Sequence, residues 1–147
     1  MQSSLSFSTF AIDHFHFGIR TTDVTELTRD NEVTPVPLSP AAVKGLINLR
    51  GQIVTAINLR HRLGISGTDY GERPISLFYS LNGHLFGFLV DAVNDILEVD
   101  ERAFEPPPGH LPESAQEFIS GVYKLEDRLL FVLDPKKIVM GIADLPR

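Results

Sequence analysis

The chain has 147 residues, contains no cysteine and carries a formal charge of -6 at pH 7. This length fits one domain, or two small sub-barrels that share a core. The lack of cysteine excludes disulfides and thiol chemistry and favours a cytoplasmic location. The acidic charge disfavours nucleic acid and anionic lipid as partners. The N-terminus does not resemble a signal peptide and the apolar runs are too short to span a bilayer, so neither export nor membrane insertion is expected.

Short segments rich in Val, Ile, Leu and Phe alternate with turn residues at intervals of about eight to twelve residues, a pattern typical of an all-β protein. Residues 5–11 and 15–19 predict an opening hairpin across the turn Asp13-His14. A third strand is expected at 24–28. The prolines of segment 30–40 then predict an extended loop, with one possible helical turn at Pro40.

The most informative stretch covers residues 43–64. Two apolar runs, 46–49 and 53–59, flank Arg50-Gly51-Gln52, where Gly51 can supply the positive φ that a tight hairpin needs. These runs are predicted to pair as antiparallel strands. Residues 64–73 are rich in Gly, Ser and Asp, and we predict that they divide the chain into two halves.

The second half repeats this pattern. Residues 75–81 and 85–90 flank Asn82-Gly83, the strongest hairpin signal in the chain. A further strand near Ile96, a stiff proline loop at 106–108 and a hairpin formed by 118–125 and 129–133 are expected to follow. Asp134-Pro135 then predicts the start of a short helix that runs to Met140.

The sequence contains none of the common dinucleotide, phosphate, serine-hydrolase, zinc-protease or EF-hand motifs, so neither an enzyme nor a cofactor is expected. His14 and His16 could share a metal ion if both lay on one strand face, but a solvent-facing pair is the favoured interpretation. The acidic residues within 91–101 could include an acid/base pair, and an exposed strand edge is again favoured.

Residues 43–54 read Val-Lys-Gly-Leu-Ile-Asn-Leu-Arg-Gly-Gln-Ile-Val and resemble the Gly-x-x-Asn-Leu-Arg-Gly-x-Ile-Val signature of the CheW family of chemotaxis coupling proteins. Further segments are similar to other family motifs in the family's order: 17–27 with the proline loop 34–37, then 87–97, 104–108 and 118–121. The resemblance covers roughly residues 5–140.

This resemblance implies an all-β fold of two packed five-stranded SH3-like barrels, with short helical turns and a short C-terminal helix. A single CheW-like domain would then cover residues 1–147, with sub-barrels at approximately 15–65 and 74–135. The N-terminal strand and the C-terminal helix would pack across both.

The resemblance also implies a non-catalytic adaptor, recruited from the cytoplasm to membrane receptor arrays. A groove between the barrels would take the hairpin tip of a chemoreceptor, and one barrel would dock on the regulatory domain of the histidine autokinase CheA. A structural SH3-like domain from an unrelated assembly remains an alternative.

Glu26 and Arg50 match family residues expected to face each other across the first barrel and to organise the partners; the alternative is an ordinary surface salt bridge. Gly45 could serve either the kinase or the receptor. The resemblance places the receptor contacts at Val24, Arg50, Gly51, Gly87, Val93, Ile96 and Gly121. From the residues alone, core packing and backbone clearance are the favoured roles of the valine, isoleucine and glycine positions.

Two positions depart from the family pattern. Thr55 and Asn58 stand where the family commonly has Pro and Asp. Neither change should disrupt the fold, but both raise the possibility of a specialised paralogue that serves another output, such as twitching motility.

Overall fold

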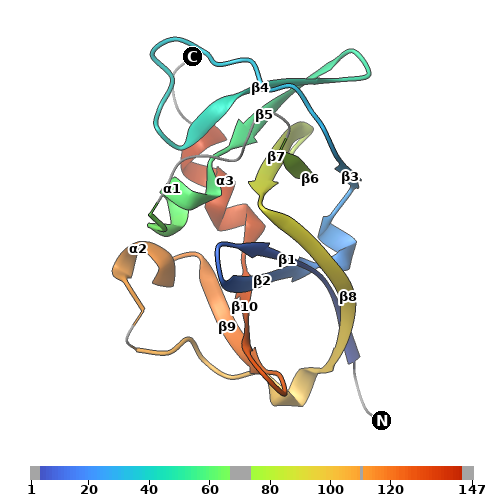
Figure 1. Cartoon of the computed structure of the whole chain (residues 1–147), viewed down its shortest axis with the longest axis vertical. Coiled ribbons are helices and arrows are strands. Elements are labelled where there is room, and N and C mark those ends of the chain that lie inside the picture. The colour runs from blue at the N-terminus through green and yellow to red at the C-terminus, as the bar shows by residue number, and fades with distance from the viewer. Residues whose placement is uncertain (1–3, 67–73, 110, 144–147) are drawn as a thin grey trace.

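The computed structural model describes residues 4–66, 74–109 and 111–143, which form two five-stranded sheets with short helices between some strands and one helix after the last strand (Figure 1). One sheet has the strand order β8-β1-β2-β10-β9 and the other the order β3-β6-β7-β5-β4. The strands of the first sheet are β1 (Ser4–Ile12), β2 (Phe15–Arg20), β8 (Ala92–Asp100), β9 (Ile119–Lys124) and β10 (Leu129–Leu133). Those of the second are β3 (Glu26–Thr28), β4 (Val43–Leu49), β5 (Gln52–Ile57), β6 (Ile75–Leu81) and β7 (His84–Val90). The helices are α1 (Leu59–Leu63), α2 (Glu113–Gln116) and α3 (Pro135–Ala143), with 3-10 turns η1 (Thr21–Asp23) and η2 (Glu101–Ala103).

The two sheets are built in the same way. Each consists of two antiparallel hairpins that meet through one parallel contact, β2 with β10 in one sheet and β5 with β7 in the other. A single strand, β8 or β3, completes each sheet at its edge. The expected all-β class with two five-stranded barrels of SH3-like type is therefore confirmed.

The expected division of the chain into sub-barrels 15–65 and 74–135 is wrong. Strands β6 and β7 belong to the sheet of β3, β4 and β5, because β6 pairs with β3 and β7 pairs with β5. The chain changes sheets between β7 and β8, and the N-terminal strand β1 lies inside the other sheet, between β8 and β2. The Gly/Ser/Asp-rich segment 64–73 marked a connection within one sheet, and residues 67–73 of it lie outside the described residues.

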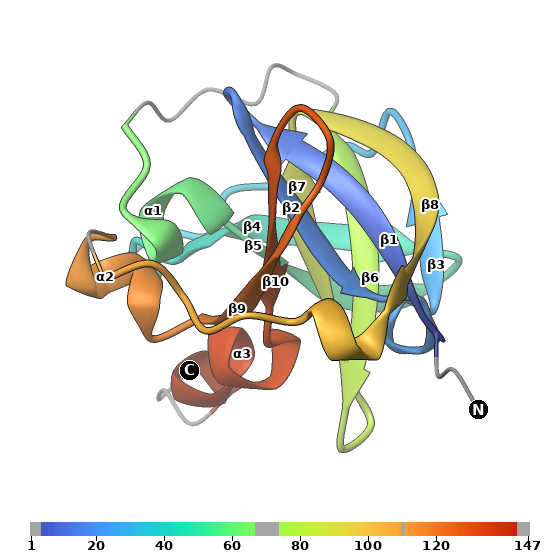
Figure 2. The same cartoon turned by 90° about the horizontal axis from the view of Figure 1, so that it is seen from below.

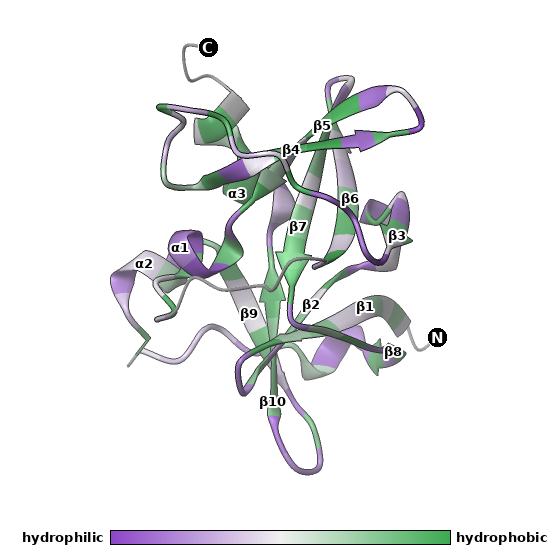
Figure 3. Ribbon diagram, turned by 45° about the horizontal axis from the view of Figure 1, so that its top comes forward, coloured by the Kyte–Doolittle hydropathy of each residue, from purple (hydrophilic) through white to green (hydrophobic). Residues whose placement is uncertain are grey.

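The expected hairpins are present. Arg50 and Gly51 both have positive φ, 51° and 85°, as do Asn82 and Gly83, 52° and 83°. This pair of left-handed residues is the geometry of a type I′ turn, whose twist matches that of the flanking strands. Figure 3 shows hydrophilic residues at the tip of the β4–β5 hairpin, which projects from the body of the molecule.

The main hydrophobic core takes side chains from both sheets and from α3. Figure 2 shows how these elements are arranged. Phe10 from one sheet, Phe88 from the other and Val139 from α3 are each 0% exposed and belong to one cluster. Two smaller hydrophobic clusters each take their side chains from one sheet and fill the inside of the barrel that this sheet forms. Because the central cluster takes side chains from both sheets, the barrels are packed as one unit.

The C-terminal helix α3 starts where the sequence predicts but ends later, and helix α1 was not predicted. The Asp134 carboxylate accepts hydrogen bonds from the N–H groups of Lys136 (3.1 Å) and Lys137 (3.4 Å), so the predicted cap is confirmed. The helix continues past Met140 to Ala143, because Ile142 also packs into the core. Helix α1 was not expected at all, since its first residue, Leu59, was assigned to the preceding apolar run.

Candidate functional site

The chain that follows one edge strand of the second sheet pairs with the other edge strand and closes the sheet into a barrel. Strands β3 and β4 lie at opposite ends of the strand order, yet the chain just beyond β3 pairs with β4. Thr34 and Leu46 exchange two backbone hydrogen bonds of 2.8 Å. Gly45 permits this approach, because a Cβ at this position would lie 2.8 Å from the carbonyl carbon of Thr34.

Glu26 and Arg50 face each other across this closure. The guanidinium of Arg50 donates two hydrogen bonds to the Glu26 carboxylate, of 2.8 and 2.7 Å, in a bidentate pair. Thr25 anchors the start of β3 by donating to the Phe78 carbonyl at 2.9 Å. The Arg50 side chain remains 71% exposed and that of Glu26 30%. The pair therefore fixes the direction of an arginine that stays accessible to a partner.

The electrostatics of the pair follow from this geometry. The hydrogen bonds from Arg50 hold the pKa of the Glu26 carboxyl below its ordinary value, so the ion pair is fully formed at neutral pH. A pocket of about 430 Å³ lies beside the ion pair. It is lined by Thr25, Glu26, Leu49, Arg50, Gln52 and Leu85.

Three of the expected receptor contacts come from neighbouring segments. Val24 follows η1, whose Thr21 hydroxyl lies 3.0 Å from that of Ser6 in β1. Strand β1 in turn pairs with β8, which carries Val93 and Ile96. Val93 is partly buried against the main core, whereas Ile96 is 61% exposed. Ile96 therefore keeps its apolar side chain at the surface and outside the core.

The expected contact glycines have different surroundings. Gly51 is exposed in the β4–β5 turn, with no atom within 4 Å of a Cβ placed there. Gly87 is buried inside the second sheet, where a Cβ would lie 3.2 Å from the Phe78 ring. Gly121 is buried in β9, where a Cβ would collide with Phe104 and lie 2.5 Å from the Glu105 carbonyl oxygen. Gly87 and Gly121 thus provide clearance and cannot offer a surface of their own.

The two histidines do not form the same-face pair that a shared metal would need. His14 lies in the β1–β2 turn with its ring 4.3 Å from that of Phe15. His16 lies in β2, where its Nδ1 is 3.3 Å from the Asn94 side-chain nitrogen and burial lowers its pKa. Among the residues that the structure describes, no three His, Asp or Glu side chains are placed to share a metal ion.

An ionic link between the two sheets was not foreseen from the sequence. Arg60 of α1 is 6% exposed, and its guanidinium lies 2.7 Å from an Asp13 oxygen and 2.6 Å from an Asp91 oxygen. Asp13 is in the β1–β2 turn, and Asp91 stands where the chain passes from one sheet to the other. The Asp91 carboxylate also accepts the Asp13 N–H at 2.7 Å. No local pattern joins three residues this far apart in sequence.

The two departures from the family pattern fit the structure. Thr55 lies in β5 between Leu46 of β4 and Phe86 of β7. Asn58 caps α1, since its side-chain oxygen accepts the His61 N–H at 3.2 Å. Aspartate is an equivalent cap, so the change from Asp to Asn preserves the start of the helix.

Fold and surfaces together define a two-barrel β protein with an accessible, fixed arginine at one hairpin tip and an exposed apolar side chain, Ile96, on a strand of the other sheet. A family model described as CheW-like domain matches residues 6–142, so the chain belongs to the CheW-like domain family. No helix in the described part of the chain is long and apolar enough to cross a membrane.

Similar proteins agree with this assignment. The chain is 30% identical to the chemotaxis protein CheW of Thermotoga maritima over 134 residues, which cover 91% of this chain and 87% of that protein. It is 30% identical to the chemotaxis protein CheW of Rhizobium meliloti over 125 residues, which cover 85% and 81%. The crystal structure of the scaffolding protein TtCheW from Thermoanaerobacter tengcongensis superposes with a TM-score of 0.80 at 28% identity and 90% coverage of both chains.

Proposed function

We infer that the chain is a non-catalytic adaptor of chemotaxis-type signalling, which couples chemoreceptors to the histidine autokinase CheA. The observation that carries this proposal is the match of the CheW-like domain to residues 6–142. The close structural likeness to a protein described as a scaffold supports it. The accessible hairpin arginine and the exposed Ile96 are features of contact surfaces and not of a reaction chamber.

The proposed partners are the regulatory domain of CheA and the cytoplasmic tip of methyl-accepting receptors, met at receptor arrays in the cytoplasm. Val24, Val93 and Ile96 would contribute the receptor surface together with the Arg50-Gly51 turn. Gly87 and Gly121 would act through the backbone clearance that they provide, and Gly45 through the closure of the second sheet.

Charge reversal at the hairpin tests the proposal. Arg50→Glu places two carboxylates opposite each other, and it should weaken binding to the CheA regulatory domain or to a receptor-tip fragment by at least roughly ten-fold. Adding Glu26→Arg should restore part of that affinity, because the pair is re-formed with its charges exchanged. Isothermal titration of the full chain with each partner measures both effects.

A matched control uses a second surface ion pair. Lys124 is 70% exposed and lies 3.4 Å from Glu105, so Lys124→Glu reverses a comparable charge at another place on the surface. Lys124→Glu should leave the affinity for the CheA regulatory domain, the affinity for the receptor-tip fragment, or both unchanged. Absence of binding of the unaltered chain to both partners at high micromolar concentration would contradict the proposal. Kinase autophosphorylation with receptor present then tests whether the chain couples the two partners.

A further inference from the structure

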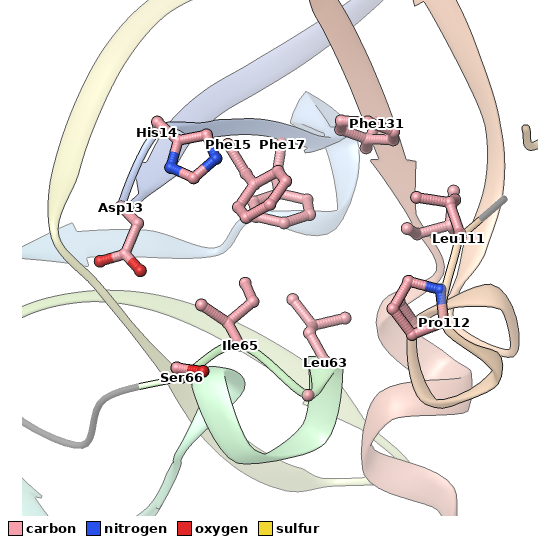
Figure 4. Close-up of a pocket in the computed structure, with 13 residues that line it drawn as sticks. Asp13, His14, Phe15, Phe17, Leu63, Ile65, Ser66, Leu111, Pro112 and Phe131 are labelled. Carbon is pink, nitrogen blue, oxygen red and sulfur yellow. The ribbon is translucent and has the colours of Figure 1, made fainter.

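A cavity of about 290 Å³ opens between the β1–β2 turn, α1 and α2 (Figure 4). None of the residues proposed for receptor or kinase contact lines it. It is therefore a separate feature of the surface, and it goes beyond the adaptor function proposed above.

The wall of the cavity is almost entirely apolar. The rings of Phe15 and Phe17 point into it from one side, and the side chains of Leu63 and Ile65 point toward them from the other (Figure 4). Leu111 and Pro112 close one end. The remaining lining residues are Asp13, His14, Gly64, Ser66, Ala115, Ile119 and Phe131.

The opposite end carries the negative charge of the site. Asp13 is the one Asp, Glu, Lys or Arg among the described lining residues, and its side chain is 40% exposed. Its hydrogen bond with Arg60 holds its pKa below the ordinary value, so it is ionised at neutral pH. Asp13, Asp91 and Arg60 form one linked group with two negative charges and one positive charge, which leaves a net charge of -1.

We propose that this cavity is a docking site for a partner protein that inserts one large apolar side chain, with a lysine or arginine next to it to meet Asp13. A cavity of this size is at the lower limit for small-molecule sites, which occupy about 300–1,000 Å³. It is suited to one anchoring side chain of the kind that dominates protein interfaces. The carboxylate at its end selects a cation beside the anchor.

Two short peptides test the chemistry directly with the full chain. One is acetyl-Ala-Phe-Lys-Ala-amide, and the other has Glu in place of Lys. The Lys peptide should shift the methyl NMR signals of Leu63, Ile65 and Ala115, with an affinity about five-fold higher than that of the Glu peptide. A third peptide with Ala in place of Phe should leave these signals unmoved.

Two variants assign the binding to the cavity. Asp13→Asn should bring the ratio of the Lys and Glu affinities close to one, and the backbone should accept it because Asn tolerates the φ of 53° found there. Ser66→Trp places a bulky side chain at an exposed position of the rim and should abolish binding of both peptides. Arg50→Glu should leave the Lys-peptide affinity unchanged, so this test is independent of the receptor and kinase contacts.

Three results would overturn the proposal. The first is no movement of the cavity methyls with the Lys peptide. The second is equal affinity of the unaltered chain for the Lys and Glu peptides. The third is self-association in analytical ultracentrifugation that Ser66→Trp removes, because the occupant would then be a second copy of this chain.

Discussion

Leu38 has an unfavourable backbone conformation and an exposed side chain. Its φ is 63°, in the left-handed region where a leucine side chain crowds the backbone, and its side chain is fully exposed at 104%. The sequence did not predict this conformation, because leucine gives no signal for it and the flanking prolines indicated only an extended loop. The left-handed turns at Arg50-Gly51 and Asn82-Gly83 could be predicted because Gly and Asn favour such φ values.

Replacement of Leu38 by asparagine should therefore stabilise the protein. Asn adopts the left-handed region at lower cost, and Leu38→Asn is expected to raise the free energy of unfolding by about 1 kcal/mol. Urea denaturation measures the change. Leu38→Ala removes the exposed apolar side chain but keeps the backbone cost, so it should give little of this gain. An equal gain from both variants would mean that side-chain exposure and not backbone conformation is the cause.

At the scale of single elements, the sequence predicts those whose ends carry local signals. Helix α3 begins where Asp134-Pro135 placed it, since a cap and a first-turn proline are both local. Helix α1 was missed although Asn58 caps it and Gly64, with a φ of 71°, ends it. Its 5 residues are too few to show a helical period, and the apolar run before it favoured a strand.

The cap of α3 gives a prediction about that element. Asp134→Ala removes the acceptor of the Lys136 and Lys137 N–H groups and should lower the free energy of unfolding by about 1 kcal/mol. Asp134→Asn keeps an oxygen in the same place and should change the stability by a few tenths of that amount. Thermal and urea unfolding of both variants decide the matter. Equal losses would show that the charge of Asp134, and not its hydrogen bonds, supports the helix.

For the whole molecule, local signals identified most strands but not their partners. β1 pairs with β8, and β5 pairs in parallel with β7 across α1 and β6, so both contacts depend on distant parts of the chain. A composition break at 64–73 could not reveal that β6 returns to the same sheet. Contacts between distant residues are equally hard to predict at the sites. The family resemblance predicted that Glu26 and Arg50 face each other, but neither the resemblance nor a local pattern predicted the contacts of Arg60.

The link made by Arg60 ties the two sheets together beside their shared apolar core, and its effect on stability should depend on pH. Arg60 lowers the pKa of Asp13 below the ordinary value of 3.8. A carboxyl group whose folded pKa is lowered stabilises the native state above its unfolded pKa, and this contribution disappears as the pH falls through the folded pKa. Arg60→Met removes the cause of the shift, so the variant should be less stable than the unaltered protein near pH 6, and the difference should shrink toward pH 2.

Urea midpoints measured at intervals between those two pH values test this expectation. Arg29→Met is the control, since Arg29 is an exposed arginine in the loop after β3, and its loss should give a small difference that does not vary with pH. If the Arg60→Met difference stays constant down to pH 2, the packing of the arginine side chain and not its ion pairs joins the sheets. The Asp13 carboxylate would then contribute nothing to stability that protonation removes.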